Sequence, residues 1–175
     1  MSVLLAWYGR QLSTRPNITN ATTTGVLFAL GDVIAQKLIE KQKKLDWGRS
    51  ARFGLVGFCF AGPVIGGWYR LLDRVITSTG PTTALKKVLC DQCLFAPCIY
   101  VALLPLIGVS KGLFTTQELK QQLTKDYKHV LINNWKIWPA VQLANFYFVP
   151  LHFRLVVVNI VALGWNTYLS WVAHQ

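Results

Sequence analysis

The segment from residue 135 to residue 154 constrains the fold of this chain most. Between Ile137 and Phe153 it contains no Asp, Glu, Lys or Arg, and a helix needs roughly 20 such residues to cross the hydrocarbon core of a bilayer. Gln142 and Asn145 lie in its middle, a proline lies near each end, and aromatic residues crowd both ends. A membrane helix packed against other helices tolerates prolines, because neighbours satisfy the freed backbone groups, and Trp and Tyr favour the membrane interface. The segment is therefore predicted to lie in a membrane.

The composition is typical of a membrane protein with semi-polar spans. Of the 175 residues, 53% are hydrophobic and only 14% are charged, against about 25% charged in soluble domains, and the mean hydropathy is +0.36. The net charge is +11, but the basic residues cluster between apolar segments, so we expect no direct binding of nucleic acid. Such clusters are typical of loops beside anionic lipid headgroups, which makes the lipid bilayer the expected partner. The clustered residues are Lys37, Lys41, Lys43, Lys44, Arg49, Arg52, Arg70, Arg74, Lys86, Lys87, Lys111, Lys120, Lys125 and Lys128.

Four apolar stretches, at residues 18–39, 52–76, 85–109 and 131–151, are long enough to span the membrane. A fifth stretch, residues 155–173, either spans the membrane or lies at its interface. The residues before the first span carry two Arg and no acidic residue, and they predict a short amphipathic helix. The predicted fold class is all-α: one membrane-embedded domain over the whole chain, built as a polytopic transmembrane helix bundle with four or five spans.

Loop charges predict an orientation if the number of spans is even. The basic loops around residues 37–52 and 111–128 then share one side of the membrane, and both termini lie on the other side. The excess of basic residues would place these two loops on the inner side of the membrane and the termini on its outer side.

The predicted spans carry polar residues at helical spacing, and these are the candidate functional residues. Polar side chains at membrane depth normally face the bundle interior or a water-filled cavity. They are interpreted either as the lining of a polar conduit or as interhelical hydrogen-bonding groups that only hold the helices together. Asp32, Gln36, Asp91, Gln142 and Asn145 are expected to converge inside the bundle. The full set is Asp32, Gln36, Asp91, Gln92, Gln142, Asn145, Asn159, Asn166 and Ser170.

The second predicted span is the richest in small residues. Gly62, Pro63, Gly66 and Gly67 lie within it, and small residues four apart allow a neighbouring helix to approach closely. Close packing is the favoured interpretation, and a hinge at the Gly-Pro step is the alternative. Interfacial positions are predicted for Trp68, Tyr69, Arg74, Trp138 and Arg154.

The cysteines and histidines do not predict a metal site. Cys90 and Cys93 have C-x-x-C spacing, but there is no second such pair and the three histidines are scattered. Packing is the favoured role for these cysteines, and a redox-sensitive gate is the alternative. The chain contains no Gly-rich phosphate loop and no G-x-S-x-G, so we expect neither an enzyme nor a bound cofactor or metal.

Nearly the whole chain resembles the Mpv/PMP family, which is typified by the twenty-two-kilodalton peroxisomal membrane protein and its mitochondrial inner-membrane relatives. The likeness is greatest to the mitochondrial members. It rests on Tyr8, Leu12, Pro16, Gly31, Asp32, Gln36, Asp46, Arg49, Arg52, Gly62, Pro63, Trp68, Tyr69, Asp91, Gln92, Pro97, Trp138, Pro139, Gln142, Asn145, Phe146, Val149, Pro150, Arg154, Trp165, Asn166, Tyr168, Leu169 and Ser170.

This resemblance implies a multi-span, channel-forming protein of an organelle membrane. It implies the mitochondrial inner membrane, with the peroxisomal membrane as the alternative, and links to membrane potential, reactive oxygen species, nucleotide pools and mitochondrial DNA maintenance. Two hypotheses follow. The first is a weakly selective channel for ions or small polar metabolites. The second is a non-conducting scaffold for a membrane complex that supports mitochondrial DNA or nucleotide metabolism. A homo-oligomer or a larger membrane complex is compatible with both.

Overall fold

The computed structural model describes residues 3–77, 81–150 and 153–175, and in these ranges every regular element is a helix. The all-α prediction is therefore confirmed. Besides α1, five helical stretches run along the length of the bundle, and three of these contain a widened π-helical turn (η). The elements are α1 (Val3–Thr14), α2 (Pro16–Ile34) with η1 (Ala35–Ile39), α3 (Trp47–Val56) with η2 (Gly57–Ala61) and α4 (Gly62–Val75), α5 (Pro81–Cys90) with η3 (Asp91–Phe95) and α6 (Ala96–Ser110), α7 (Thr116–Tyr147), and α8 (Arg154–Ala173).

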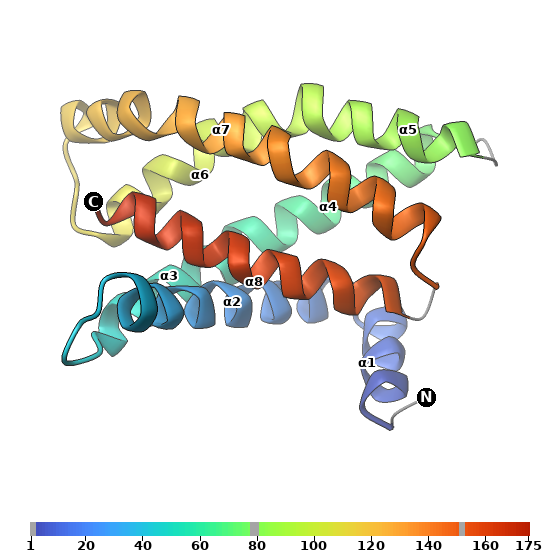
Figure 1. Ribbon diagram of the computed structural model, residues 1–175, viewed down its shortest axis with the longest axis horizontal. Coiled ribbons are helices and arrows are strands. Elements are labelled where there is room, and N and C mark those ends of the chain that lie inside the picture. Colours follow the sequence, from blue (N-terminus) through green and yellow to red (C-terminus); the bar gives the residue numbers. More distant parts are fainter. Residues whose placement is uncertain (1–2, 78–80, 151–152) are drawn as a thin grey trace.

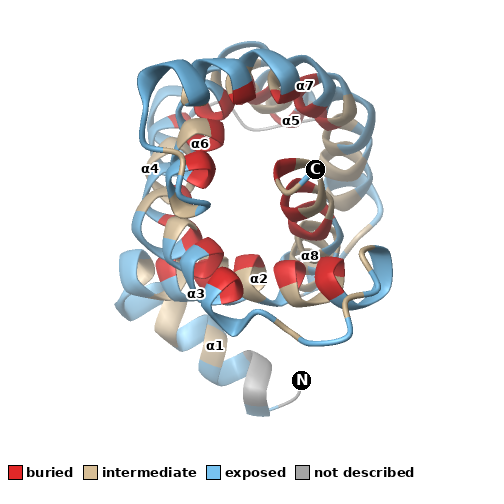
Figure 2. Cartoon of the chain, turned by 90° about the vertical axis from the view of Figure 1, so that its left-hand side faces the viewer, coloured by how far each residue is buried: buried red, intermediate tan, exposed pale blue. Residues whose placement is uncertain are grey.

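The long helices lie side by side, and α1 projects across one end of the bundle (Figure 1). Viewed end-on, they surround a common axis with their buried residues turned inward (Figure 2). The chain alternates in direction, so the amino and carboxyl termini lie at opposite ends (Figure 1). The expectation that both termini share a side was made for an even number of passes, and that condition does not hold for the described helices, because the fifth apolar stretch adds one more pass along the bundle.

Among the described residues, four helices are long and apolar enough to cross a membrane: Pro16–Ile39, Trp47–Val75, Thr82–Ser110 and Arg154–Ala173. The first three match the predicted spans, and the fourth is the segment that the sequence left undecided. The predicted span at residues 131–151 is not among these four helices. Residues 131–147 form the second half of α7, a helix of 32 residues. Residues 151–152 lie outside the described part of the chain.

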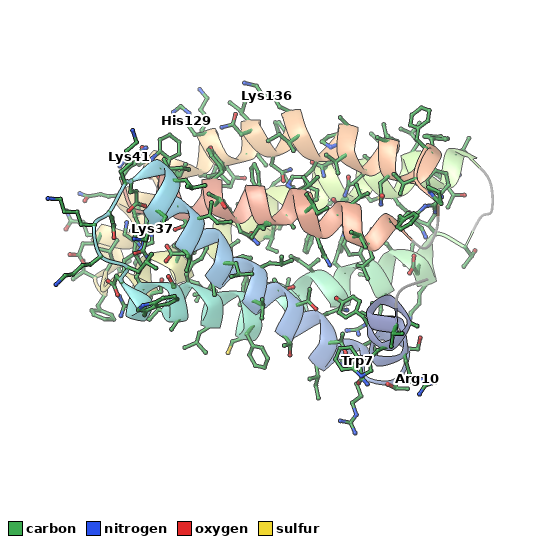
Figure 3. The ribbon with its side chains drawn as sticks, turned by 60° about the horizontal axis from the view of Figure 1, so that its bottom comes forward. Trp7, Arg10, Lys37, Lys41, His129 and Lys136 are labelled. Atoms are coloured by element: carbon green, nitrogen blue, oxygen red, sulfur yellow. The ribbon has the colours of Figure 1, made fainter. Side chains whose placement is uncertain are left out.

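Helix α7 is amphipathic because charged residues follow one another along its outer face. Lys125, Lys128 and Lys136 are exposed, and His129 and Lys136 point away from the bundle (Figure 3). Its inner face packs against α6 and α8. Helix α7 is therefore an integral part of the bundle although its composition is more polar than that of the four candidate spans.

The two basic loops do lie at one end. Arg52 in α3 donates to the carbonyl of Ser110, with the nitrogen and oxygen 2.8 Å apart, and Lys111 donates to the carbonyl of Ala173 at the end of α8. Figure 3 shows Lys37 and Lys41 at this end and Trp7 and Arg10 at the other. We refer to these as the basic end and the amino-terminal end of the bundle.

Local sequence explains where several helices begin. Pro16 stands in the first turn of α2, where its missing N–H costs no helical hydrogen bond. The Asp46 carboxylate accepts from the backbone N–H of Arg49 and caps α3, with an N–O distance of 2.8 Å. Thr115 and Glu118 form a reciprocal capping box that starts α7.

The three π-helical turns lie in three of the membrane-spanning segments. Two of them end two residues before Pro63 and Pro97, and a proline ring excludes the carbonyl four residues earlier, which lies within the turn, from helical hydrogen bonding. A widened turn accommodates this disruption and often marks a functional site. In η3 it brings Asp91 and Gln92, which are adjacent in sequence, into the bundle interior as buried residues.

Glycines allow α2 to approach its neighbours closely. A Cβ atom added to Gly62 would lie 2.6 Å from the Cα atom of Ala21, and one added to Gly31 would lie 2.8 Å from the Cβ atom of Asn166. Gly67 has no such neighbour within 4 Å. The backbone of α2 therefore contacts α4 and α8 at distances that any other residue would prevent.

Replacing Gly62 by Ala is expected to destabilise the protein by about 1–3 kcal/mol, because the added methyl group meets backbone atoms that cannot rotate away. Gly67→Ala is the matched control and is expected to be neutral or slightly stabilising, since helical Gly→Ala lowers the entropy of the unfolded chain. Thermal unfolding of the purified proteins in detergent measures both. Equal melting temperatures for the two variants would contradict the close contact at Gly62.

Candidate functional site

A cavity of about 380 Å³ lies inside the bundle. The side chains around it come from α1, α2, α4, α6, α7 and α8 together with η2 and η3. Arg70 and Asp73 line it at the amino-terminal end and are exposed, whereas Phe28, Leu103 and Leu169 line its inner end and are buried. The cavity therefore opens toward the amino-terminal end and is closed by apolar side chains part of the way along the bundle.

The cavity has mainly apolar walls, and its polar groups come from a hydrogen-bonded cluster that reaches it from three helical segments. The Asp91 carboxylate, which is 6% exposed, accepts from Trp68 Nε1 at 2.9 Å, Gln142 Nε2 at 2.7 Å and Gln92 Nε2 at 3.0 Å. Gln142 Nε2 also lies 3.3 Å from the Tyr69 hydroxyl. The carboxylate thus links α4, η3 and α7, and its partners supply dipoles rather than charge.

The cluster extends from Asp91 toward the bundle core. Asn134 Nδ2 donates to Gln92 Oε1 at 2.7 Å, and the Tyr100 hydroxyl donates to Asn134 Oδ1 at 2.9 Å. Trp135 Nε1 donates to the backbone carbonyl of Gln92 at 2.9 Å. These contacts satisfy side chains that would be costly to bury without partners.

Aromatic rings form much of the remaining wall. Phe95 lines the cavity, and Trp68 stacks on it from behind the wall, with ring centres 4.9 Å apart and planes inclined by 6°. Trp165 packs edge-on against Trp138, with centres 6.4 Å apart, and lies 6.3 Å from Tyr100. A few convergent polar groups in a mainly apolar cavity with several aromatic rings are typical of a small-molecule site.

A second polar cluster lies at the basic end and is fully buried. The Asp32 carboxylate, 0% exposed, accepts from Arg49 Nε at 2.8 Å, Ser50 Oγ at 2.6 Å and Gln36 Nε2 at 2.7 Å. Ser170 Oγ on α8 also donates to it. Asp32 therefore joins α2, η1, α3 and α8, all through charge-assisted hydrogen bonds.

Arg49 is the cation of this second cluster. Besides Asp32, its guanidinium donates to both oxygens of Glu40, at 2.7 and 2.6 Å, and to Ser170 Oγ at 3.1 Å. The residue is only 8% exposed. The prediction of a loop cation beside lipid headgroups is therefore wrong for Arg49, because folding turns it inward onto two carboxylates.

An apolar layer separates the two clusters. Phe28 packs on Phe53 with ring centres 5.0 Å apart, and Leu104, Ile107 and Leu169 complete the buried core around them. The five polar residues that were expected to converge inside the bundle therefore do not meet at one place. Asp32 and Gln36 belong to the second cluster, and Asp91 and Gln142 belong to the first.

Asn145 belongs to neither cluster. Its side-chain oxygen is buried and has no hydrogen-bond partner among the described residues. The other predicted polar residues are distributed between the two regions, with Gln92, Asn159 and Asn166 lining the cavity and Ser170 in the second cluster.

Predicted packing and interfacial residues lie around these clusters. Gly62, Gly66, Tyr69 and Trp138 line the cavity, while Pro63 and Arg74 are exposed on α4 and Gly67 is half-buried. Arg154 lies 5.1 Å from the centre of the Phe146 ring and donates to the carbonyls of Phe146 and Val149 at the end of α7. Cys90 is half-buried and Cys93 exposed, and both are free thiols. The described residues contain no cluster of three or more potential metal ligands.

Arg49, Glu40, Ser50 and Tyr100 contribute to these clusters but were not among the predicted site residues. Arg49 and Glu40 stand beside a run of lysines, so nothing in the local sequence separates them from solvated loop charges. The only sequence signal was the presence of Arg49 in the pattern that resembles a known family.

These features define an all-α membrane protein whose helices enclose a mainly apolar cavity with a buried carboxylate in its wall. The sequence model of the Mpv17 / PMP22 family matches residues 114–170. The chain is 49% identical to the mitochondrial inner membrane protein Mpv17 of Rattus norvegicus and 48% identical to that of Homo sapiens, in both cases over 96% of each chain. It is 40% identical to the protein sym-1 of Neurospora crassa, over 98% of this chain and all of the relative.

The chain therefore belongs to the Mpv17/PMP22 family, and its place is the mitochondrial inner membrane. The family and the location expected from the sequence are both confirmed. No solved structure matches the chain.

Arg49→Gln is expected to destabilise the protein by about 3–5 kcal/mol, because it leaves two carboxylates near one another without their cation. Lys87→Gln is the control: Lys87 pairs with the exposed Asp73 at 2.6 Å, and an exposed pair contributes at most about 1 kcal/mol. Thermal unfolding in detergent measures both. Adding Asp32→Asn to Arg49→Gln should restore part of the loss, and a loss no larger than that of Lys87→Gln would contradict the role of Arg49.

The second cluster also predicts a pH dependence through Glu40, which lies just beyond the first span. Hydrogen bonds from Arg49 hold the pKa of Glu40 below its ordinary value of 4.5. A lowered pKa in the folded state contributes stability that is present above the unfolded-state pKa and is lost as the pH falls through the folded-state pKa. Melting temperatures in acid should therefore fall more steeply for wild type than for Glu40→Gln. Parallel profiles would contradict this coupling.

Proposed function

We propose that this protein is a channel of the mitochondrial inner membrane that passes ions or small polar solutes through the cavity. The observation that carries the proposal is a cavity of about 380 Å³ that contains the polar side chains of Asp91, Gln92 and Gln142, opens at one end of the bundle and reaches toward its middle. A conduction path needs polar lining at membrane depth, and Asp91, Gln92 and Gln142 supply it.

In this conformation the path is closed. Beyond the cavity lie the apolar layer around Phe28 and Leu169 and then the hydrogen-bonded cluster around Asp32 and Arg49. Opening would require α8 to move relative to α2 and α3, because Ser170 links α8 to the Asp32 and Arg49 side chains. The proposed gate is therefore the second cluster together with the apolar layer. A regulated leak of this kind fits the expected links to membrane potential, reactive oxygen species, nucleotide pools and mitochondrial DNA maintenance.

The alternative is a non-conducting scaffold, and one observation favours it. Nearly every buried polar side chain described here has a hydrogen-bond partner on another helix or within its own, with Gln122 and Asn145 the exceptions among the described residues. Polar groups used in this way hold helices together without any need for a conduction path.

Asp91→Asn distinguishes the two functions. The change keeps the size of the side chain, replaces one acceptor oxygen with an amide NH₂ group and removes the only charge that the described residues place in the inner part of the cavity, so a channel should shift its selectivity toward anions. Reversal potentials of purified protein in planar bilayers under a salt gradient measure this. Glu118→Gln removes a carboxylate from the exposed start of α7 and is the matched control. If highly pure wild-type protein shows no current, the channel is excluded and the scaffold takes its place.

A further inference from the structure

The sign of the charge inside the cavity is opposite to that of the whole protein. Of the described residues, three charged ones line it, Arg70, Asp73 and Asp91, so this lining has a net charge of −1, whereas the chain carries +11. Arg70 and Asp73 are exposed at the mouth. In the inner part, the charge is that of Asp91 alone.

Asp91 has no cationic partner among the described residues. The ion pairs found there are those of Arg49 with Asp32 and Glu40, and of Lys87 with Asp73. Its oxygens accept three hydrogen bonds, two at Oδ2 and one, from Trp68, at Oδ1. A carboxylate can accept about four, so Oδ1 keeps one acceptor position for a further group. A buried carboxylate without a counter-charge favours binding of a cation.

The walls select among cations. The cavity is lined by Tyr69, Phe95, Tyr100, Trp138 and Trp165, and aromatic faces attract organic ammonium groups. A divalent metal ion would need several acidic, Cys or His ligands, and no cluster of three occurs among the described residues. Phosphate-bearing solutes would meet an uncompensated carboxylate and, inside the mouth, no lining Lys or Arg.

We propose that the cavity is a binding site for a small organic monocation, a protonated amine or a quaternary ammonium compound, with its charged group at Asp91 and its apolar part against the aromatic walls. The volume of about 380 Å³ falls in the range of small-molecule sites, roughly 300–1,000 Å³. The site deepens the proposed channel function, since it names the class of solute that the path would admit. Binding is nevertheless measurable without any current.

The test compares choline with 3,3-dimethylbutan-1-ol, its uncharged carbon isostere, and with inorganic phosphate. Isothermal titration calorimetry and tryptophan fluorescence of the purified full-length protein in detergent measure binding. Saturable choline binding is expected, with the isostere weaker by about tenfold or more because it lacks the charge, and phosphate without effect at the cavity. Equal affinity for choline and its isostere, or tighter binding of phosphate, would overturn the proposal.

Asp91→Asn should weaken choline binding by about tenfold or more, while Glu118→Gln, which removes one negative charge far from the cavity, should leave it within about twofold. Should Asp91→Asn fail to fold, the comparison of choline with its isostere on wild type still decides. Choline binding without current would exclude the channel and keep the site. Current without choline binding would keep the channel and overturn the site.

Discussion

The contact between the Arg49 guanidinium and the Asp32 carboxylate is the interaction on which the basic end of the bundle depends. Asp32 is fully buried, and an ionised carboxylate in that position is tolerated only with a cation and hydrogen-bond donors around it. Arg49 supplies the cation, and Ser50, Gln36 and Ser170 supply the donors. Because these groups come from α2, η1, α3 and α8, satisfying one carboxylate determines how three passes of the chain meet.

Asp32 and Asp91, two of the buried aspartates, illustrate different uses of the same residue type. Asp32 is neutralised by a guanidinium and does not line the cavity, so its charge serves only to hold neighbouring helices together. Asp91 is held only by the dipoles of Trp68, Gln92 and Gln142 and lines an open space. A charge stabilised by dipoles alone still attracts a counter-ion. This difference is why the proposed solute site lies at Asp91 and the proposed gate at Asp32.

The π-helical turn at Asp91–Phe95 connects the packing to the site. Asp91 and Gln92 are neighbours in sequence, and on a regular helix neighbours point about 100° apart. The widened turn lets both be buried and lets Gln92 reach Asn134 while Asp91 reaches Trp68. Pro97, just after this turn, is the sequence feature that favours the irregularity.

The sequence by itself determined the all-α class, three of the four candidate spans, the family and some of the polar residues that lie inside the bundle, among them Asp32, Gln36 and Asp91. Hydropathy and helical spacing carry this information because lipid forces every backbone group into a helix and turns polar side chains inward. Only the tertiary structure decided that α8 is the fourth candidate span, that Arg49 is buried, and that Asp32 and Asp91 lie in separate clusters. Those outcomes depend on which helix faces which, and partners such as Arg49 and Ser170, 121 residues apart, leave no mark in local sequence.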